Sequence, residues 1–217
     1  MTHFLNYVCL AATCLLWVDV AAQPAWELKK ETDGIRVYLR DNPDSPIKEL
    51  LIETEMEASL SSVAALLNDA DHYHLWVYKT SRSELVQKLS PHRIVYHSVS
   101  DFPWPLSDRE LYVLSEMRQD PQTHALFSTS RLWPDAPPPD DDYVRIPYFY
   151  SQWTFTPLPD GRLQLRYYLR SDPGGYLPAW LVNLALDQGP VATIEAFRQM
   201  VNQPPYRQAQ LAHIIEP

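Results

Sequence analysis

Cysteine, glycine and clusters of basic residues are all scarce in this chain of 217 residues. The two cysteines, Cys9 and Cys14, lie near the amino terminus, so we do not expect disulfides to stabilise the rest of the chain. No Asn-x-Ser/Thr glycosylation acceptor occurs. The net charge of -9 and the dispersed Lys and Arg residues argue against a nucleic-acid partner. With 46% hydrophobic residues, the chain is expected to rely on one sizeable core.

Recognisable catalytic and metal-binding motifs are also lacking. The sequence contains no GxSxG elbow, no glycine-rich phosphate loop and no HExxH helix. His72 and His74 lie two residues apart, with Asp69 and Asp71 nearby, but no second cluster completes a metal-ligand set. We therefore expect no metal and no cofactor.

The amino terminus has the features of a secretion signal. Residues 4–18 form one apolar run, which is shorter than the ~20 residues that cross a bilayer. Val20, Ala21 and Ala22 provide small residues before Gln23, so cleavage is expected after Ala22. Because no Lys or Arg precedes the run, an uncleaved anchor is the alternative. The prediction is a signal peptide at 1–22, one domain at 23–217, and a periplasmic or secreted protein.

The following chain is dominated by two-residue alternation of apolar and polar side chains, which is typical of half-buried strands. Helical spacing first replaces it at residues 59–71, behind a Ser59 or Ser61 cap. The proline-rich stretch at 134–142 is expected to be a surface loop. The predicted strands are Ile35–Leu39, Lys48–Met56, Glu84–Leu89, Arg93–Val99, Arg109–Met117, Ala125–Leu132, Val144–Thr156 and Arg162–Arg170.

Residues 171–201 predict a long apolar helix near the carboxyl terminus. A Pro-Gly-Gly break follows Asp172, and Gly189 and Pro190 interrupt the helical pattern, so we expect a kink or two abutting helices. Together with the strands, this helix predicts an α+β fold in which a curved antiparallel sheet closes around it. The apolar stripe comprises Trp180, Leu181, Leu184, Val191, Ile194, Phe197 and Val201.

Several motifs occur in a characteristic order: DGIRVYLR, HLWV, FPWPLSDRELYV, VRIPYFYSQWTFTPLPDG and DPGGYLPAWLVN. In this order, over residues 26–201, the chain resembles a START lipid-transfer domain of the helix-grip superfamily. The resemblance implies an internal hydrophobic tunnel between the sheet and the C-terminal helix. It also implies a lipid or other hydrophobic small molecule as partner, with transient membrane contact. We expect a monomer by default.

Arg109 is the sharpest candidate for a polar contact inside the tunnel. Alternation places its guanidinium on the same side as Leu111, and the resemblance implies a buried basic residue paired with an acid. This sequence offers His97 or Asp101 in place of the usual mid-strand glutamate. The alternative is an Arg bridged to Asp108 or to backbone carbonyls at a strand edge.

Aromatic and apolar residues supply the other candidates. Trp104 lies between Pro103 and Pro105 on a stiff loop, which the resemblance places at the tunnel mouth as a lid. Simple packing of the indole is the alternative, as core packing is for the remaining candidates. The remaining ligand-contacting candidates are Trp153, Tyr168, Trp180 and Leu184.

Three functional hypotheses follow. The leading one is a carrier that binds one lipid and needs no catalysis. The second is a cyclase-type helix-grip enzyme in which Arg109, His97 and Tyr168 would take part. The third is a ligand-sensing adaptor that contacts a membrane partner. The sequence leaves open whether a sterol, phospholipid, fatty acid or quinone is bound, and an inward Arg109 would favour an anionic or hydroxylated head group.

Overall fold

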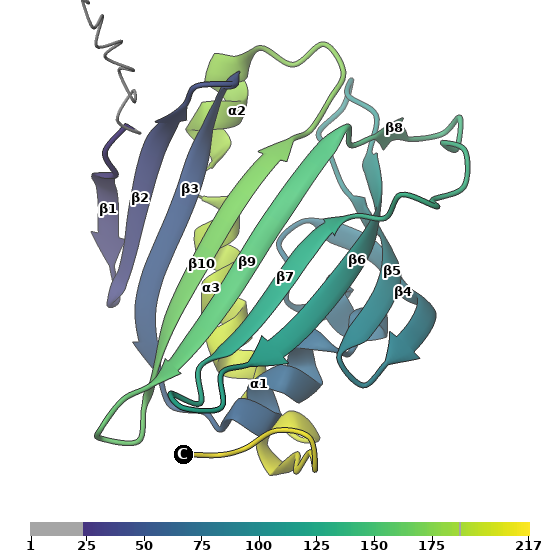
Figure 1. Ribbon diagram of the computed structural model, residues 1–217. Helices are drawn as coiled ribbons and strands as arrows, with labels where there is room; N and C mark the ends of the chain where they lie inside the picture. Colours follow the sequence, from purple (N-terminus) through teal and green to yellow (C-terminus); the bar gives the residue numbers. More distant parts are fainter. Residues whose placement is uncertain (1–23, 187) are drawn as a thin grey trace, which may run out of the picture.

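The computed structural model describes residues 24–186 and 188–217, so the predicted signal peptide at 1–22 lies outside the described residues. One ten-stranded sheet has the order β1-β2-β3-β10-β9-β7-β6-β5-β4, with β8 paired in parallel to β6. The helices lie on one side of this sheet (Figure 1). The strands are β1 (Glu27–Thr32), β2 (Ile35–Asn42), β3 (Ser45–Met56), β4 (Thr80–Ser90), β5 (Arg93–Ser100), β6 (Arg109–Gln119), β7 (Leu126–Leu132), β8 (Val144–Arg145), β9 (Tyr148–Pro157) and β10 (Leu163–Asp172).

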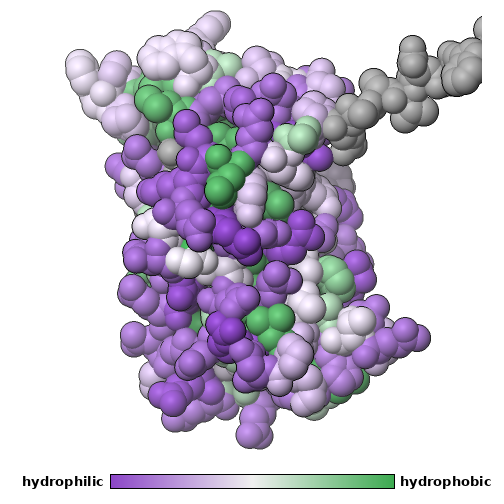
Figure 2. Space-filling model, turned by 90° about the vertical axis from the view of Figure 1, so that its left-hand side faces the viewer, coloured by the Kyte–Doolittle hydropathy of each residue, from purple (hydrophilic) through white to green (hydrophobic). Residues whose placement is uncertain are grey.

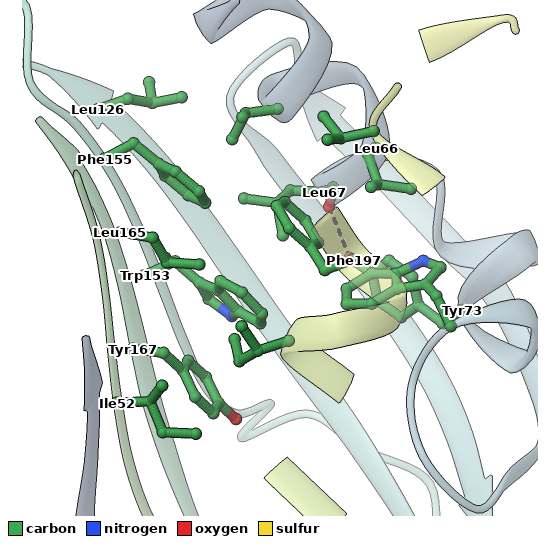
Figure 3. Close-up of a cluster of buried hydrophobic side chains, with 14 of the residues drawn as sticks. Ile52, Leu66, Leu67, Tyr73, Leu126, Trp153, Phe155, Leu165, Tyr167 and Phe197 are labelled. Atoms are coloured by element: carbon green, nitrogen blue, oxygen red, sulfur yellow. Dashed lines mark hydrogen bonds between the residues drawn. The ribbon is translucent and has the colours of Figure 1, made fainter. Parts of the chain in front are cut away.

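The core lies between the sheet and the helices α1 (Leu60–Leu67) and α3 (Gly189–Met200). Figure 3 shows Phe155 and Trp153 on the sheet pointing toward Phe197 on α3. The rings of Trp153 and Phe197 are 5.0 Å apart between centroids. Phe155 and Phe197 are both fully buried, so these large aromatic groups join the two layers. The predicted α+β helix-grip architecture, an antiparallel sheet with a C-terminal helix, is confirmed.

The C-terminal helical segment consists of two helices, as the Gly189–Pro190 interruption predicts. α2 (Ala179–Ala185) precedes this interruption and α3 begins at Gly189. A Cβ at position 189 would lie 2.9 Å from the Tyr78 ring, so glycine allows α3 to begin against this side chain. α3 buries Val191, Ile194 and Phe197, whereas no residue of α2 is buried. Only the second half of the predicted stripe therefore packs in the core.

The predicted helix at residues 59–71 is shorter than expected. Ser59 caps α1 by accepting a hydrogen bond from the Ser62 amide at 3.0 Å. The Glu216 carboxylate accepts two further bonds, from the amides of Leu60 and Ser61 at 3.0 and 2.8 Å. α1 ends at Leu67, and a 3-10 helix, η1 (Ala70–Leu75), replaces the rest of the expected helix. The chain's last residues thus stabilise its first helix.

Two further details differ from the sequence prediction. The single strand expected at 144–156 is interrupted at Ile146 and Pro147, which separates β8 from β9. A short 3-10 helix, η2 (Tyr206–Gln208), follows α3. Within residues 24–186 and 188–217, no helix has the length and apolar character needed to cross a membrane.

Candidate ligand-binding site

A cavity of about 280 Å³ lies between the inner face of the sheet, η1 and the start of α3. Strand alternation directs the inner-face residues of β5, β6, β7, β9 and β10 toward it. Gly189, Pro190 and Thr193 of α3 complete the lining. Trp153 and Tyr167 project from the sheet into this region in Figure 3. The volume is near the lower limit of small-molecule pockets, ~300 Å³.

Serine hydroxyls form a connected row on the sheet wall of the cavity. Ser115, Ser130 and Ser151 lie opposite one another on β6, β7 and β9. Ser130 Oγ donates to Ser115 Oγ at 3.2 Å, and Ser115 Oγ lies 3.4 Å from Ser128 Oγ. Ser98 lines the cavity from β5. These short side chains occupy positions that larger core residues would fill, and each hydroxyl can both donate and accept a hydrogen bond.

Aromatic residues also line the cavity, and one of them has an unpaired hydrogen-bond donor. The Trp76 side chain is 5% exposed, and its Nε1 has no hydrogen-bond partner among the described residues. A buried donor without an acceptor is uncommon, because it has lost its bond to water. Burial raises the pKa values of Tyr96 and Tyr167, so both phenols are neutral near pH 7.

Arg109 lies on the inner face, as predicted, but it does not line the cavity. Its side chain is 2% exposed, and it donates to the carbonyl of Ser107 and, at 3.5 Å, to the carbonyl of Pro173. The guanidinium lies 4.0 Å above the Phe102 ring. Burial lowers its pKa, and nearby Asp108 opposes that shift. Arg109 thus joins the loop at 101–108 to the turn that begins at Pro173, which matches the alternative of backbone bridging.

Neither His97 nor Asp101, the two partners expected for Arg109, pairs with it. His97 lies on the outer face of the sheet, because successive side chains of a strand point to opposite faces and the next residue, Ser98, points inward. Its ring stacks on that of Tyr112, with 4.4 Å between the ring centroids. Its Nε2 is 3.2 Å from Glu110, which also pairs with Arg145 at 2.8 Å. Asp101 is exposed in the strand-connecting loop. The structure therefore does not bring His97, Asp101 and Arg109 together.

The other predicted site residues divide between the cavity and the surface. Trp153 lines the cavity. Tyr168 faces the outer side of the sheet, 6.1 Å from the Trp26 ring, where burial raises its pKa to about 12. Trp104, Trp180 and Leu184 are 93%, 68% and 63% exposed. These three residues contribute apolar surface near the end of the molecule at which Arg109 lies.

His72 and His74 both lie exposed at the surface. His72 Nδ1 is 2.8 Å from Asp69 Oδ1, and this hydrogen bond raises the His72 pKa. In the described part of the chain, no group of three or more His, Cys, Asp or Glu side chains is arranged to hold a metal ion.

Sequence reasoning missed the serine row and Trp76. A signal for the serines was present, because Ser98, Ser128, Ser130 and Ser151 all occupy inward positions of alternating strands. Small polar residues at neighbouring inward positions indicate space within a core. No comparable signal identified Trp76, since it follows a 3-10 helix rather than a periodic element.

The geometry defines a helix-grip protein with a cavity between the sheet and the helices, and the described lining of this cavity carries no charged side chain. The START domain model matches residues 12–207, and the chain belongs to the START domain family. Bovine (Bos taurus) phosphatidylcholine transfer protein is 25% identical over 175 residues, which cover 76% of this chain and 78% of that protein. An uncharacterized protein of Pseudomonas aeruginosa is 25% identical over 200 residues, 91% of this chain and 97% of that one.

Solved structures agree with this assignment. A STAR-related lipid transfer protein fragment from Xanthomonas axonopodis has a TM-score of 0.76 at 30% identity, covering 82% of this chain and 99% of that fragment. Human STARD10 has a TM-score of 0.71 at 19% identity, covering 84% of this chain and 76% of that one, which supports the fold alone. The names of the bovine protein and of the Xanthomonas axonopodis protein both describe lipid transfer.

Proposed function

We propose that this protein binds one lipid or similar hydrophobic molecule in the cavity between the sheet and α3, and carries it between membranes. The observation that carries the proposal is an internal space of about 280 Å³ bounded by Trp76, Trp153 and Tyr167 in a chain of the START family. Each buried methylene contributes ~0.8 kcal/mol, so a short acyl segment is enough for measurable binding. We propose a carrier rather than an enzyme, with no cofactor.

Exchange of the ligand requires the cavity to open, and Arg109 indicates where. Its two carbonyl partners lie in different segments, Ser107 in the loop before β6 and Pro173 in the turn after β10. These segments lie side by side at the top of Figure 1. We propose that they separate to admit the ligand, with the Arg109 contacts broken in the open state.

Exposed apolar residues surround this proposed opening and support transient membrane contact. α2 exposes Trp180, Leu181 and Leu184, and Trp104 projects from the neighbouring loop. Figure 2 shows hydrophobic atoms gathered at the upper left, at the height of α2 in Figure 1. Asn183 holds α2 against β3 by accepting from the Lys48 amide at 2.9 Å, so the apolar side chains are presented on an anchored helix. Because residues 1–22 have the composition of a signal peptide, we propose that this contact occurs outside the cytoplasm.

A cavity-filling substitution tests the proposal. Delipidated wild-type protein and the variants Ser151→Phe and Ser81→Phe are incubated with vesicles of phosphatidylcholine, phosphatidylglycerol, palmitic acid and cholesterol, then re-isolated and extracted. Ser151 lines the cavity, whereas Ser81 is exposed on β4 and serves as the matched control. We expect wild type and Ser81→Phe to carry about one lipid per protein, and Ser151→Phe to carry less than about a tenth of that.

Overpacking a core costs ~1–3 kcal/mol, so thermal unfolding is recorded for each variant. Ser130→Leu, a smaller insertion in the same row, replaces Ser151→Phe if the latter fails to fold. Lipid occupancy of both filled variants at the wild-type level would contradict binding in this cavity.

A further inference from the structure

The polar side chains in the described lining of the cavity are neutral: they are hydroxyl groups and indole N–H groups. Among residues 24–186 and 188–217, it includes no Asp, Glu, Lys, Arg or His. Arg109 is the nearest cation along β6, but it is held by the carbonyls of Ser107 and Pro173 outside this lining. A charged head group placed here would lose its hydration without gaining an opposite charge, which is strongly unfavourable.

The polar groups that do line the cavity suit a neutral oxygen. Ser130 and Ser151 are buried and lie opposite each other on β7 and β9, and serine hydroxyls both donate and accept. The indole of Trp76 can only donate, and its buried Nε1 lacks an acceptor in the described part of the molecule. A ligand hydroxyl or carbonyl oxygen is the kind of acceptor that this donor lacks, and Trp76, Ser130 and Ser151 line the same cavity.

The cavity volume limits the size of such a ligand. If each non-hydrogen atom takes about the ~30 Å³ of a water molecule in the liquid, then about 280 Å³ holds roughly nine of them. This corresponds to one short chain with its polar end rather than to a two-chain phospholipid. The cavity as it stands in the structure therefore fits a single-chain segment.

We propose that the cavity selects a neutral lipid bearing a hydroxyl or carbonyl oxygen, which accepts a hydrogen bond from Trp76 Nε1 and bonds to the hydroxyls of Ser130 and Ser151. This inference rests on the proposed function and specifies its ligand class. It differs from phospholipid transport in that recognition uses neutral hydrogen bonds and no ion pair.

Four probes with the same eight-carbon chain test the selection: octan-1-ol, octane, octyl phosphate and octyltrimethylammonium. Binding to the full domain is followed by NMR, with the Trp76 indole N–H signal assigned through Trp76→Phe. We expect octan-1-ol to shift this signal and to bind at least about tenfold more tightly than either charged probe. The variant Ser130→Ala/Ser151→Ala weakens octan-1-ol about tenfold and leaves octane binding undiminished, because only the alcohol uses the hydroxyls.

Ser81→Ala removes an exposed strand serine and is the matched control, for which wild-type affinities are expected. Equal affinity for octyl phosphate or octyltrimethylammonium and for octan-1-ol would overturn the inference while leaving hydrophobic binding intact. Loss of octane and octan-1-ol binding to the same extent in the serine variant would also overturn it. If none of the four probes binds, the proposed function itself fails.

Discussion

The two C-terminal helices are adjacent in the sequence and both carry large apolar side chains, yet they have opposite surroundings. α3 buries Val191, Ile194 and Phe197 against the sheet. α2 buries none of its residues and presents Trp180 and Leu184 to solvent. The difference teaches that the apolar residues of α3 stabilise the fold, whereas those of α2 are available for contact with another apolar surface.

The largest expected effect is on the buried side of this comparison. Phe197→Ala is expected to lower the free energy of unfolding by ~3–5 kcal/mol, because the ring is fully buried and leaves a cavity beside Trp76 and Trp153. Urea denaturation measures the change. A loss below ~1 kcal/mol would contradict the claim that the buried residues of α3 stabilise the fold.

Arg109 connects the segment leading to α2 with the loop at 101–108. Its replacement therefore tests whether the exposed half of the C-terminal segment can move while the buried half stays in place. Arg109→Met is expected to destabilise the protein by ~1–3 kcal/mol, because the carbonyls of Ser107 and Pro173 lose their donor. It is also expected to accelerate lipid exchange between vesicles by several-fold.

Arg118→Met is the matched control for Arg109→Met. Arg118 lies on the same strand and stacks 3.9 Å above Phe127, much as Arg109 stacks 4.0 Å above Phe102, but it is exposed. We expect the control to change stability by less than ~1 kcal/mol and to leave exchange unchanged. Equal exchange rates in both variants would contradict the opening proposed at Arg109.

The exposed side of the comparison predicts changed transfer with unchanged stability. Trp180→Ser/Leu184→Ser is expected to alter the free energy of unfolding by only ~0.5 kcal/mol, because both side chains are largely exposed. Transfer of lipid from donor vesicles should fall by at least about tenfold, since each side chain contributes up to ~1.5–3 kcal/mol when it enters an apolar phase completely. Leu89→Ser, an exposed leucine on β4, is the control. A decrease in the free energy of unfolding as large as that expected for Phe197→Ala would contradict the exposed position of α2.

Trp104 is expected to give the smallest effect. Trp104→Ala should leave stability within ~0.5 kcal/mol of wild type, because the indole is 93% exposed. Exchange kinetics, measured by stopped-flow fluorescence, should change more than equilibrium affinity. Equal losses of rate and affinity would exclude a lid role for this residue.

The sequence predicted the fold well because strand alternation and helical spacing are local signals. Residues 171–201 also revealed the break at Gly189, but periodicity could not show that Trp180 and Leu184 lie outside the core, since an apolar stripe has the same spacing whether it is buried or exposed. Burial depends on what the sheet covers, which is a property of the tertiary structure.

The candidate site was predicted less completely. Alternation placed Arg109 on the inner face correctly, but one of its two carbonyl partners, Pro173, lies 64 residues away in the sequence, and no local pattern reveals such a contact. His97 was chosen as a partner by proximity in sequence, although it is one residue out of phase with inward Ser98 and therefore faces the other side.

Cavity occupancy tests the central claim most directly. The protein is purified from its native compartment, and its intact mass under native conditions is recorded before and after organic extraction. We predict a co-purifying hydrophobic molecule at about one per protein, which is lost on extraction and is absent from Ser151→Phe. A wild-type protein that is reproducibly empty and takes up none of the offered lipids would contradict the account.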